Sequence, residues 1–184
     1  MKHALIVGAQ GVGKSTLIKR VLRELALPVS GYETKKEDAL ADPALGTPIY
    51  IYPAGKEHIR SPERLLGYRA CENPVTYTEA FDRFAERMNT EADTGIVVLD
   101  EIGFMESGAA AFREAIMRKL DADVPVLAAV KNVDTPFLCQ VREHPNCRCF
   151  YIDEENRDDL FPQVLEYLKE TLLTPNSQLP TPHS

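Results

Sequence analysis

ALIVGAQGVGKSTLIKRVLREL, residues 4–25, contains an apolar run, a glycine-rich turn and an amphipathic segment in direct succession. The run at residues 4–7 stops at Gly8, which is typical of a buried strand that leads into a turn. Pro28 closes a segment in which apolar residues recur with helical spacing, at Leu17, Ile18, Val21, Leu22 and Leu25. The stretch therefore predicts a strand, a glycine loop and a helix as the first unit of the fold.

Residues Gly8–Ser15 match the pattern G-x-x-x-x-G-K-[ST], and they lie between a predicted strand and a predicted helix, as this phosphate-binding loop (P-loop) requires. Glycines let consecutive backbone N–H groups turn toward an anion, and the start of the helix adds its positive dipole end. We expect Lys14 to reach the β- and γ-phosphates of a nucleoside triphosphate, Ser15 to bind Mg²⁺, and Thr16 to bond on the α-phosphate side. The predicted nucleotide-binding residues are Gly8, Ala9, Gln10, Gly11, Val12, Gly13, Lys14, Ser15 and Thr16, of which Lys14 is also catalytic.

A second apolar run, at residues 96–99, ends in the paired carboxylates Asp100 and Glu101. An acidic residue at the end of a strand beside the phosphate loop holds the metal ion, directly or through water, so Asp100 is the second predicted metal ligand. A carboxylate immediately after it can orient or deprotonate a water for in-line attack on the γ-phosphorus. Glu101 is therefore the predicted catalytic residue for hydrolysis, although either carboxylate can also be a solvated charge at a strand end.

Further apolar strands alternate with amphipathic helices along the rest of the chain. This alternation predicts an α/β fold of the P-loop NTPase type, with a mostly parallel sheet flanked by helices on both faces. Prolines on either side of residues 49–52 favour a short inserted hairpin or edge strand there. Farther along the chain, Ser107 can cap the helix that begins after it. Strands are expected near residues 29–34, 49–52, 96–99, 124–130 and 149–152, and helices near 78–88, 107–120, 136–143 and 160–172.

Length and charge limit the classes of partner. A chain of 184 residues with 44% apolar composition predicts one domain, at residues 1–173, and the polar, proline-rich residues 174–184 predict a disordered tail. The 21 basic and 28 acidic residues give a net charge of -7, so we expect no nucleic-acid partner. Apolar runs are too short to span a bilayer, and functional sequence begins near residue 4 in place of a signal peptide. We therefore expect a cytoplasmic protein without a membrane partner.

The four cysteines are irregularly spaced, which favours reduced thiols. One of them, Cys71, is isolated, and three lie close to a histidine in the pattern C-x4-H-x2-C-x-C. Four such ligands can hold zinc, but the pattern lacks the paired C-x2-C of common zinc folds, so ordinary cysteines are the preferred interpretation. The residues concerned are Cys139, His144, Cys147 and Cys149.

Three other functions use the same loop. A regulatory GTPase is suggested by D-x-x-G at residues 100–103, but the guanine-reading N-K-x-D is replaced by VKNVD, so we interpret Lys131 and Asp134 as loop residues. A kinase of a nucleotide or small metabolite would need arginines near the phosphates, and candidates for this role are Arg60, Arg64 and Arg69. A non-enzymatic binding module would use the triphosphate as a conformational switch.

The chain resembles the family of small P-loop nucleoside-triphosphatases that includes the cancer-related nucleoside-triphosphatase. The resemblance covers most of residues 3–170, and it is carried by GAQGVGKSTLIKR at 8–20, GYETKKE at 31–37, VVLDEIGFME at 97–106 and ENRDDLFP at 155–162. It implies Mg-dependent hydrolysis of ATP, GTP and other triphosphates to diphosphate and phosphate, with broad base tolerance.

The resemblance also implies roles for single residues. It puts Asn156 and Arg157 near the base or ribose and Thr34 near the γ-phosphate, whereas Asn156 can equally cap the closing helix. Two departures affect substrate selection and partner contacts. Phe104 occupies a position where the family tends to have lysine, and the family's basic hairpin is replaced by residues 39–52.

Overall fold

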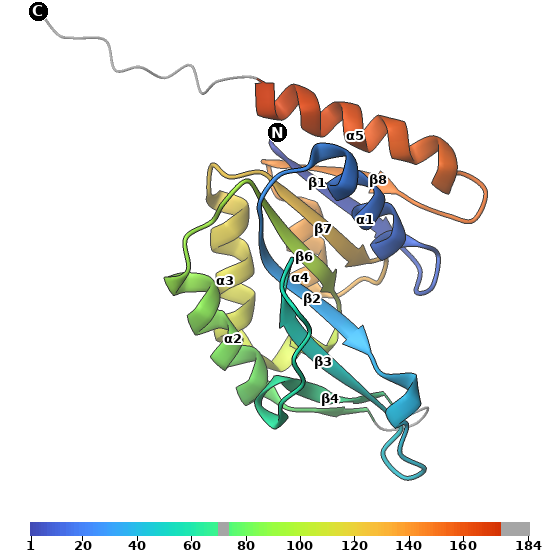
Figure 1. The fold of residues 1–184 in the computed structure, drawn as a ribbon, viewed down its shortest axis with the longest axis vertical. Coiled ribbons are helices and arrows are strands. Elements are labelled where there is room, and N and C mark those ends of the chain that lie inside the picture. Colours follow the sequence, from blue (N-terminus) through green and yellow to red (C-terminus); the bar gives the residue numbers. More distant parts are fainter. Residues whose placement is uncertain (70–73, 174–184) are drawn as a thin grey trace, which may run out of the picture.

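The computed structural model describes residues 1–69 and 74–173, which form one eight-stranded sheet with helices packed on both faces (Figure 1). The strand order is β5-β4-β3-β2-β6-β7-β1-β8. The strands are β1 (His3–Gly8), β2 (Val29–Lys36), β3 (Thr47–Pro53), β4 (Leu65–Arg69), β5 (Val75–Thr76), β6 (Ile96–Ile102), β7 (Val126–Lys131) and β8 (Cys147–Tyr151). The helices are α1 (Lys14–Leu25), α2 (Thr78–Thr90), α3 (Ala110–Asp121), α4 (Pro136–Arg142) and α5 (Arg157–Leu173).

The sheet has a parallel part and an antiparallel part. β2, β6, β7, β1 and β8 pair in parallel, whereas β3, β4 and β5 extend the sheet beyond β2 by antiparallel pairing. Because the central strands are covered on both faces, each is a continuous apolar run without alternation. Side chains that alternate along these strands divide the interior into two layers, with α2, α3 and α4 on one face and α1 and α5 on the other.

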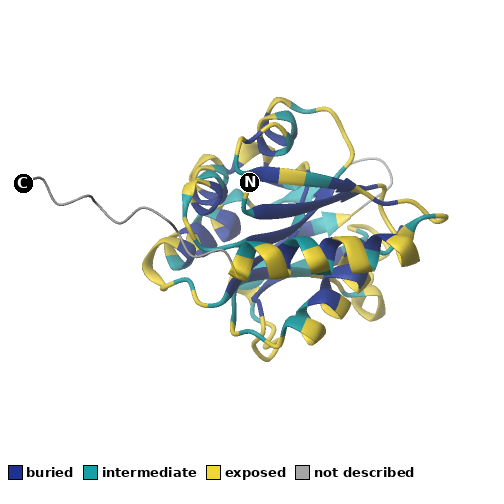
Figure 2. Ribbon diagram, turned by 90° about the horizontal axis from the view of Figure 1, so that it is seen from above, coloured by how far each residue is buried: buried dark blue, intermediate teal, exposed yellow. Residues whose placement is uncertain are grey.

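Seen from above, dark-blue buried strands lie between two layers of helices whose outer faces are exposed (Figure 2). The predicted helical stripes explain this packing, since Leu17, Ile18 and Val21 of α1 face the sheet and Phe112 of α3 is fully buried. The α/β fold with a mostly parallel sheet and helices on both faces is thus confirmed. Among the described residues, no helix combines the length and the apolar character needed to cross a membrane.

One detail of the sequence-based prediction, the helix cap at Ser107, was wrong, and one alternative for residues 49–52 is excluded. Of the two alternatives for residues 49–52, an inserted hairpin or an edge strand, the structure has the hairpin: these residues are part of β3, which pairs antiparallel with β4 and is not at the edge of the sheet. β4 lies within a segment whose sequence gives no clear periodicity. Ser107 does not cap α3: it belongs to a short 3-10 helix, Met105–Gly108, and its hydroxyl donates to the Phe104 carbonyl. Cys71 and the tail at 174–184 lie outside the described residues.

His3, at the start of β1, is fully buried and links three elements. Its Nε2 lies 2.9 Å from the Leu120 carbonyl oxygen, and its Nδ1 accepts the Val126 amide proton at 3.1 Å. Since a carbonyl only accepts and an amide only donates, these partners select the neutral ring with its proton on Nε2. Burial lowers the pKa of His3 from 6.5 to about 4.

We predict that this histidine makes the fold sensitive to acid. Its pKa is lower in the folded chain than in the unfolded chain, so the unfolded chain binds more protons between pH 6.5 and about 4. The free energy of unfolding should therefore decrease as the pH falls through this window. Urea unfolding at several pH values should show a steeper decrease for the wild type than for His3→Gln, and equal slopes would contradict the assignment.

Candidate active site

The phosphate-binding loop connects the carboxyl end of β1 to α1, at the edge of the sheet where ligands of such folds bind. Gly13 is the residue before α1 and has a φ of 110°, and Gly11 has a φ of 79°. L-residues with side chains rarely adopt such angles, so these glycines allow the chain to curl around the start of α1. The loop thereby presents the helix N-terminus as an anion site.

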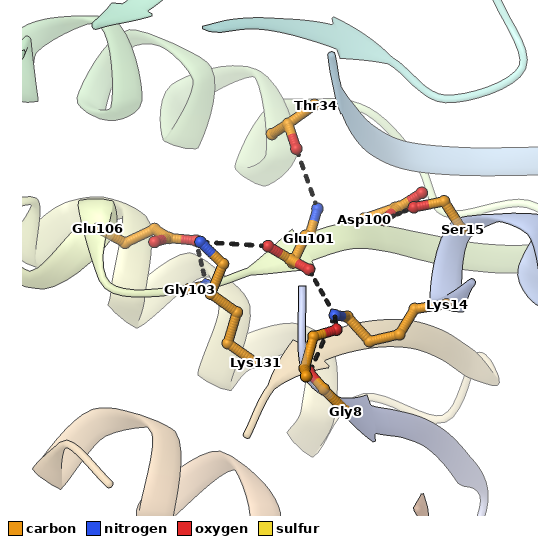
Figure 3. A network of polar contacts seen from close by, with 10 residues as sticks. Gly8, Lys14, Ser15, Thr34, Asp100, Glu101, Gly103, Glu106 and Lys131 are labelled. Carbon is orange, nitrogen blue, oxygen red and sulfur yellow. Dashed lines mark hydrogen bonds and ion pairs between the residues drawn. The ribbon is translucent and has the colours of Figure 1, made fainter. Parts of the chain in front are cut away.

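Lys14 is the first residue of α1, and its side chain folds back over the loop (Figure 3). Its Nζ donates to the carbonyl oxygens of Gly8 at 3.0 Å and Ala9 at 2.7 Å, and it lies 2.9 Å from Oε2 of Glu101. Only 3% of the Lys14 side chain is exposed. Because a buried ammonium is stable only with close partners, these three oxygens fix its position at the end of β1.

Ser15 and Asp100 come together from α1 and β6. The Ser15 hydroxyl donates to Oδ1 of Asp100 at 2.9 Å, and Asp100 is buried. Burial raises the pKa of the Asp100 carboxyl to about 6, against the lowering effect of the Ser15 hydrogen bond. A hydroxyl and a carboxylate beside the loop form an oxygen donor set that suits Mg²⁺, which takes few protein ligands and completes its shell with water and phosphate oxygens.

Glu101 lies at the centre of the site, with a partly exposed carboxylate. Its backbone amide donates to Oγ1 of Thr34 at 3.2 Å, and its Oε1 lies 3.4 Å from Nζ of Lys131. β6 pairs with β2 on one side and β7 on the other, so Thr34 and Lys131 reach it from both neighbours. The structure therefore brings Thr34 to Glu101, and it adds Lys131, which sequence reasoning treated as a loop residue.

A pocket of about 210 Å³ opens beside these residues. Gln10 and Gly11 of the loop line it together with Ser15, Asp100 and Glu101. Its wall also includes residues outside the phosphate loop and the paired carboxylates, namely Lys36, Ile49, Phe104, Met105 and Lys131. These come from β2, β3, the segment after β6 and the end of β7, which only the sheet order brings together.

Arg69 is placed differently from the two other candidate arginines. It is the last residue of β4 and lines the pocket that contains Ser15 and Asp100. Arg64 lies in the 3-10 helix before β4, where its guanidinium donates to the exposed Ile59 carbonyl at 2.8 Å, and Arg60 precedes it in an exposed loop. The antiparallel extension of the sheet thus carries Arg69 toward the phosphate loop.

A second pocket, of about 280 Å³, lies between the start of α1 and the start of α5. It is lined by Gly13 and Thr16 of the loop region and by Arg157, the first residue of α5. Asn156 does not cap α5 with its side chain: Nδ2 donates to the Tyr151 carbonyl and Oδ1 accepts the Asp153 amide. Asn156 therefore shapes the β8–α5 loop that brings Arg157 to the nucleotide-binding loop.

Val12 takes no direct part in either pocket wall. Its side chain is buried in the layer formed by α1 and α5, where it anchors the loop. Asp134 lies after β7, and its carboxylate pairs with Arg142 of α4.

Glu106, another residue missed from sequence, is almost fully buried and accepts the Gly103 amide at 2.8 Å. Burial raises the pKa of its carboxyl to about 7. A carboxylate in a 3-10 turn has no sequence signature, so the sequence did not indicate that Glu106 holds the Gly103 amide.

The cysteines and the histidine of this pattern have separate partners in the structure. Cys147 is buried in β8, Cys149 donates to the Arg142 carbonyl, and Nε2 of His144 lies 3.2 Å from Asp121. Burial raises the pKa of the Cys147 thiol to about 12, which disfavours the thiolate that zinc requires. Within residues 1–69 and 74–173, no group of three or more His, Cys, Asp or Glu is arranged to hold a metal ion.

Known proteins resemble this chain over most of its length. A family model described as NTPase matches residues 3–165. The nucleoside-triphosphatase THEP1 of Thermotoga maritima is 33% identical over 171 residues, which cover 90% of this chain and 94% of that protein. The protein of the same name from Pyrococcus abyssi is 31% identical and is matched over 92% of its length.

Two solved structures have the same fold. The crystal structure of THEP1 from the hyperthermophile Aquifex aeolicus superposes with a TM-score of 0.66 at 25% identity, covering 91% of this chain and 99% of that one. The solution structure of a human cancer-related nucleoside triphosphatase superposes with a TM-score of 0.64 at 23% identity, covering 92% and 98%. With a family model that spans nearly the whole described chain and relatives above 30% identity, this chain belongs to the NTPase family.

Proposed function

We propose that this protein is a Mg²⁺-dependent nucleoside-triphosphatase that hydrolyses ATP, GTP and other triphosphates to the diphosphate and phosphate. The observation that carries the proposal is the placement of Glu101 within 2.9 Å of Lys14, at the pocket where a terminal phosphate would lie. A cation that can bind phosphate and a carboxylate that can accept a proton from water are thus adjacent before any substrate binds. The names of the relatives support the same reaction class.

In this proposal the loop and Lys14 bind the phosphates. The backbone N–H groups of Gly8–Ser15 and the N-terminus of α1 surround the β-phosphate, and Lys14 bridges to the γ-phosphate. Lys14 already lies against the loop, so its ammonium needs only to exchange Glu101 for phosphate oxygens. The residue is therefore preorganised for an anion.

Ser15 and Asp100 are the proposed holders of Mg²⁺, whose chemistry would be to neutralise developing charge on the β- and γ-phosphate oxygens. Metal binding needs an ionised Asp100, and a bound cation favours that form over the protonated one. The Ser15 hydroxyl, which donates to Asp100 in the free protein, would turn a lone pair toward the ion. These two residues therefore link nucleotide and metal binding.

Glu101 is the proposed partner of the attacking water. The water oxygen forms a bond to the γ-phosphorus while the bond to the β–γ bridging oxygen breaks, and the diphosphate leaves with that oxygen. The water proton passes to the Glu101 carboxylate and then to solvent. Thr34 supports this role because its hydroxyl holds the Glu101 amide and so fixes the end of β6.

Broad base tolerance forms part of the proposal. The pocket at Gly13 and Arg157 has two guanidinium groups in its wall, from Arg20 and Arg157, which can flank a base without reading its edge, and the Asp158 carboxylate in the same wall pairs with Arg20. Asp134, the residue that a guanine-binding motif of a GTPase would need, pairs instead with Arg142.

The cytoplasmic location and the lack of a nucleic-acid partner stay predictions from the sequence.

A small-molecule kinase is the second candidate, and one observation favours it. The pocket beyond the loop has apolar walls at Ile49, Phe104 and Met105, which a phosphate and a water do not need. Incubation with Mg-ATP and candidate acceptors distinguishes the two functions. Free phosphate without an acceptor supports the hydrolase, whereas product that depends on an acceptor supports the kinase.

We predict that Glu101→Gln binds nucleotide but hardly turns it over. The amide keeps the size of the side chain and loses the proton acceptor, so kcat should fall by at least about 100-fold. Calorimetry with Mg-ATP should still show binding, because Lys14 keeps its phosphate contacts. Full turnover by this variant would show that another group accepts the proton of the attacking water.

Removal of the metal is expected to abolish phosphate release. Chelation by EDTA should stop turnover of the wild type, and added Mg²⁺ should restore it. In Ser15→Ala, which removes one of the two proposed ligands, the Mg²⁺ concentration for half-maximal rate should rise by about tenfold or more. An unchanged Mg²⁺ dependence in that variant would exclude Ser15 as a ligand.

Arg69 should contribute to turnover, unlike its neighbour Arg64. A guanidinium near the terminal phosphate stabilises transition-state charge, so Arg69→Ala is expected to lower kcat by about tenfold or more. Arg64→Ala removes an arginine of the same segment whose visible partner is the Ile59 carbonyl, and it serves as the matched control with near wild-type kcat. Equal effects of the two variants would refute a specific role for Arg69.

A further inference from the structure

The carboxylate of Glu101 is bound by two lysines, one at each oxygen (Figure 3). Oε2 lies 2.9 Å from Nζ of Lys14, and Oε1 lies 3.4 Å from Nζ of Lys131. Lys14 comes from the start of α1, whereas Lys131 is the last residue of β7. The two ammonium groups therefore approach the same carboxylate from different elements.

Only one of these lysines can keep Glu101 as a partner during the reaction. The proposed function, on which this inference rests, assigns the ammonium of Lys14 to the phosphates. When a triphosphate takes over Lys14, Oε2 of Glu101 loses its ion pair and the carboxylate comes to lie beside a polyanion. Like charges at such separations repel each other, so an unpaired Glu101 would turn away from the γ-phosphate. Lys131 is the cation that remains in contact with Oε1.

Lys131 is held in place for this contact. Its Nζ lies 4.3 Å from the centre of the Phe104 ring, a cation–π distance, and only 16% of its side chain is exposed. Its stem passes so close to Gly103 that a Cβ there would lie 3.2 Å from Cδ of Lys131. The side chain is therefore confined between Gly103, the aromatic ring and Glu101, and little conformational freedom is lost when it holds the carboxylate.

The backbone of β7 does not depend on this side chain. Lys131 pairs with Gly8 of β1 through main-chain register, and the apolar residues Val126–Val130 bury that strand. Glu106 is the other acidic group near Lys131, and it already has the Gly103 amide as a partner. The stability of the strand and the position of Glu101 are thus separable in an experiment.

We propose that Lys131 is a positioning residue for hydrolysis: it retains the Glu101 carboxylate at the γ-phosphate end of the pocket after nucleotide has displaced that carboxylate from Lys14. In this proposal Lys131 acts through Glu101, the group that it contacts in the structure. Its removal should therefore slow the chemical step and leave nucleotide binding unchanged.

Lys131→Met removes the ammonium and keeps most of the apolar stem. We expect kcat for phosphate release from Mg-ATP to fall by about tenfold or more, with KM changed by less than about twofold. Lys131→Arg keeps a cation and should recover most of kcat. Lys169→Met, on the exposed face of α5, is the matched control and should have wild-type kcat. Lys131→Gln is measured in parallel, so that the test does not depend on one variant that folds poorly.

Several results would overturn the proposal: wild-type kcat in Lys131→Met and Lys131→Gln, a raised KM at unchanged kcat, or a loss that arginine does not recover. The Glu101→Gln background separates this proposal from the proposed function. If Lys131 acts through Glu101, adding Lys131→Met to Glu101→Gln should not lower turnover below that of Glu101→Gln alone. A loss as large as Lys131→Met causes in the wild type would also contradict the proposal for Lys131. Wild-type turnover by Glu101→Gln itself would instead contradict the proposed function, whatever Lys131 does.

Discussion

The buried ammonium of Lys14 is the constraint on which the arrangement of the site depends. A charge with 3% exposure is tolerated only where oxygens surround it, and here two belong to the loop carbonyls of Gly8 and Ala9. The third belongs to Glu101, at the end of β6. The loop and the end of β6 must therefore lie together, and the ion pair links the phosphate-binding element to the element that carries the carboxylates.

Sheet topology satisfies this constraint. β7 lies between β1 and β6, and all three run parallel, so their carboxyl ends open at the same edge. That edge receives Lys14 from the helix after β1, Glu101 from β6 and Lys131 from β7. Thr34 arrives from β2 on the far side of β6 and holds the Glu101 amide. Polar side chains from four elements thus converge, although they are separated by up to 117 positions in the chain.

Some of these residues could be predicted and others could not, for a reason that lies in the motifs. Lys14, Ser15, Asp100 and Glu101 occupy fixed places in short patterns, and the structure brings them together in two pairs, Ser15 with Asp100 and Lys14 with Glu101. Arg69 and Lys131 reach the same pocket from strand ends; the sequence named Arg69 only as one of three candidate arginines, and it gave Lys131 no role in the site. In the sequence they cannot be told apart from an ordinary surface arginine and a loop lysine, because the contacts that give them a place in the site are made with other strands.

By itself, the sequence determined the parallel core, the helices on both faces and the phosphate loop, since hydrophobic periodicity and the G-x-x-x-x-G-K-S pattern are local properties. Only the tertiary structure decided that β4 and β5 continue the sheet beyond β3. It also decided that Ser107 belongs to a 3-10 helix and does not cap α3. It also decided which cations face Glu101. Strand order and the register between strands depend on pairings between distant segments, and a single sequence carries no direct record of those pairings.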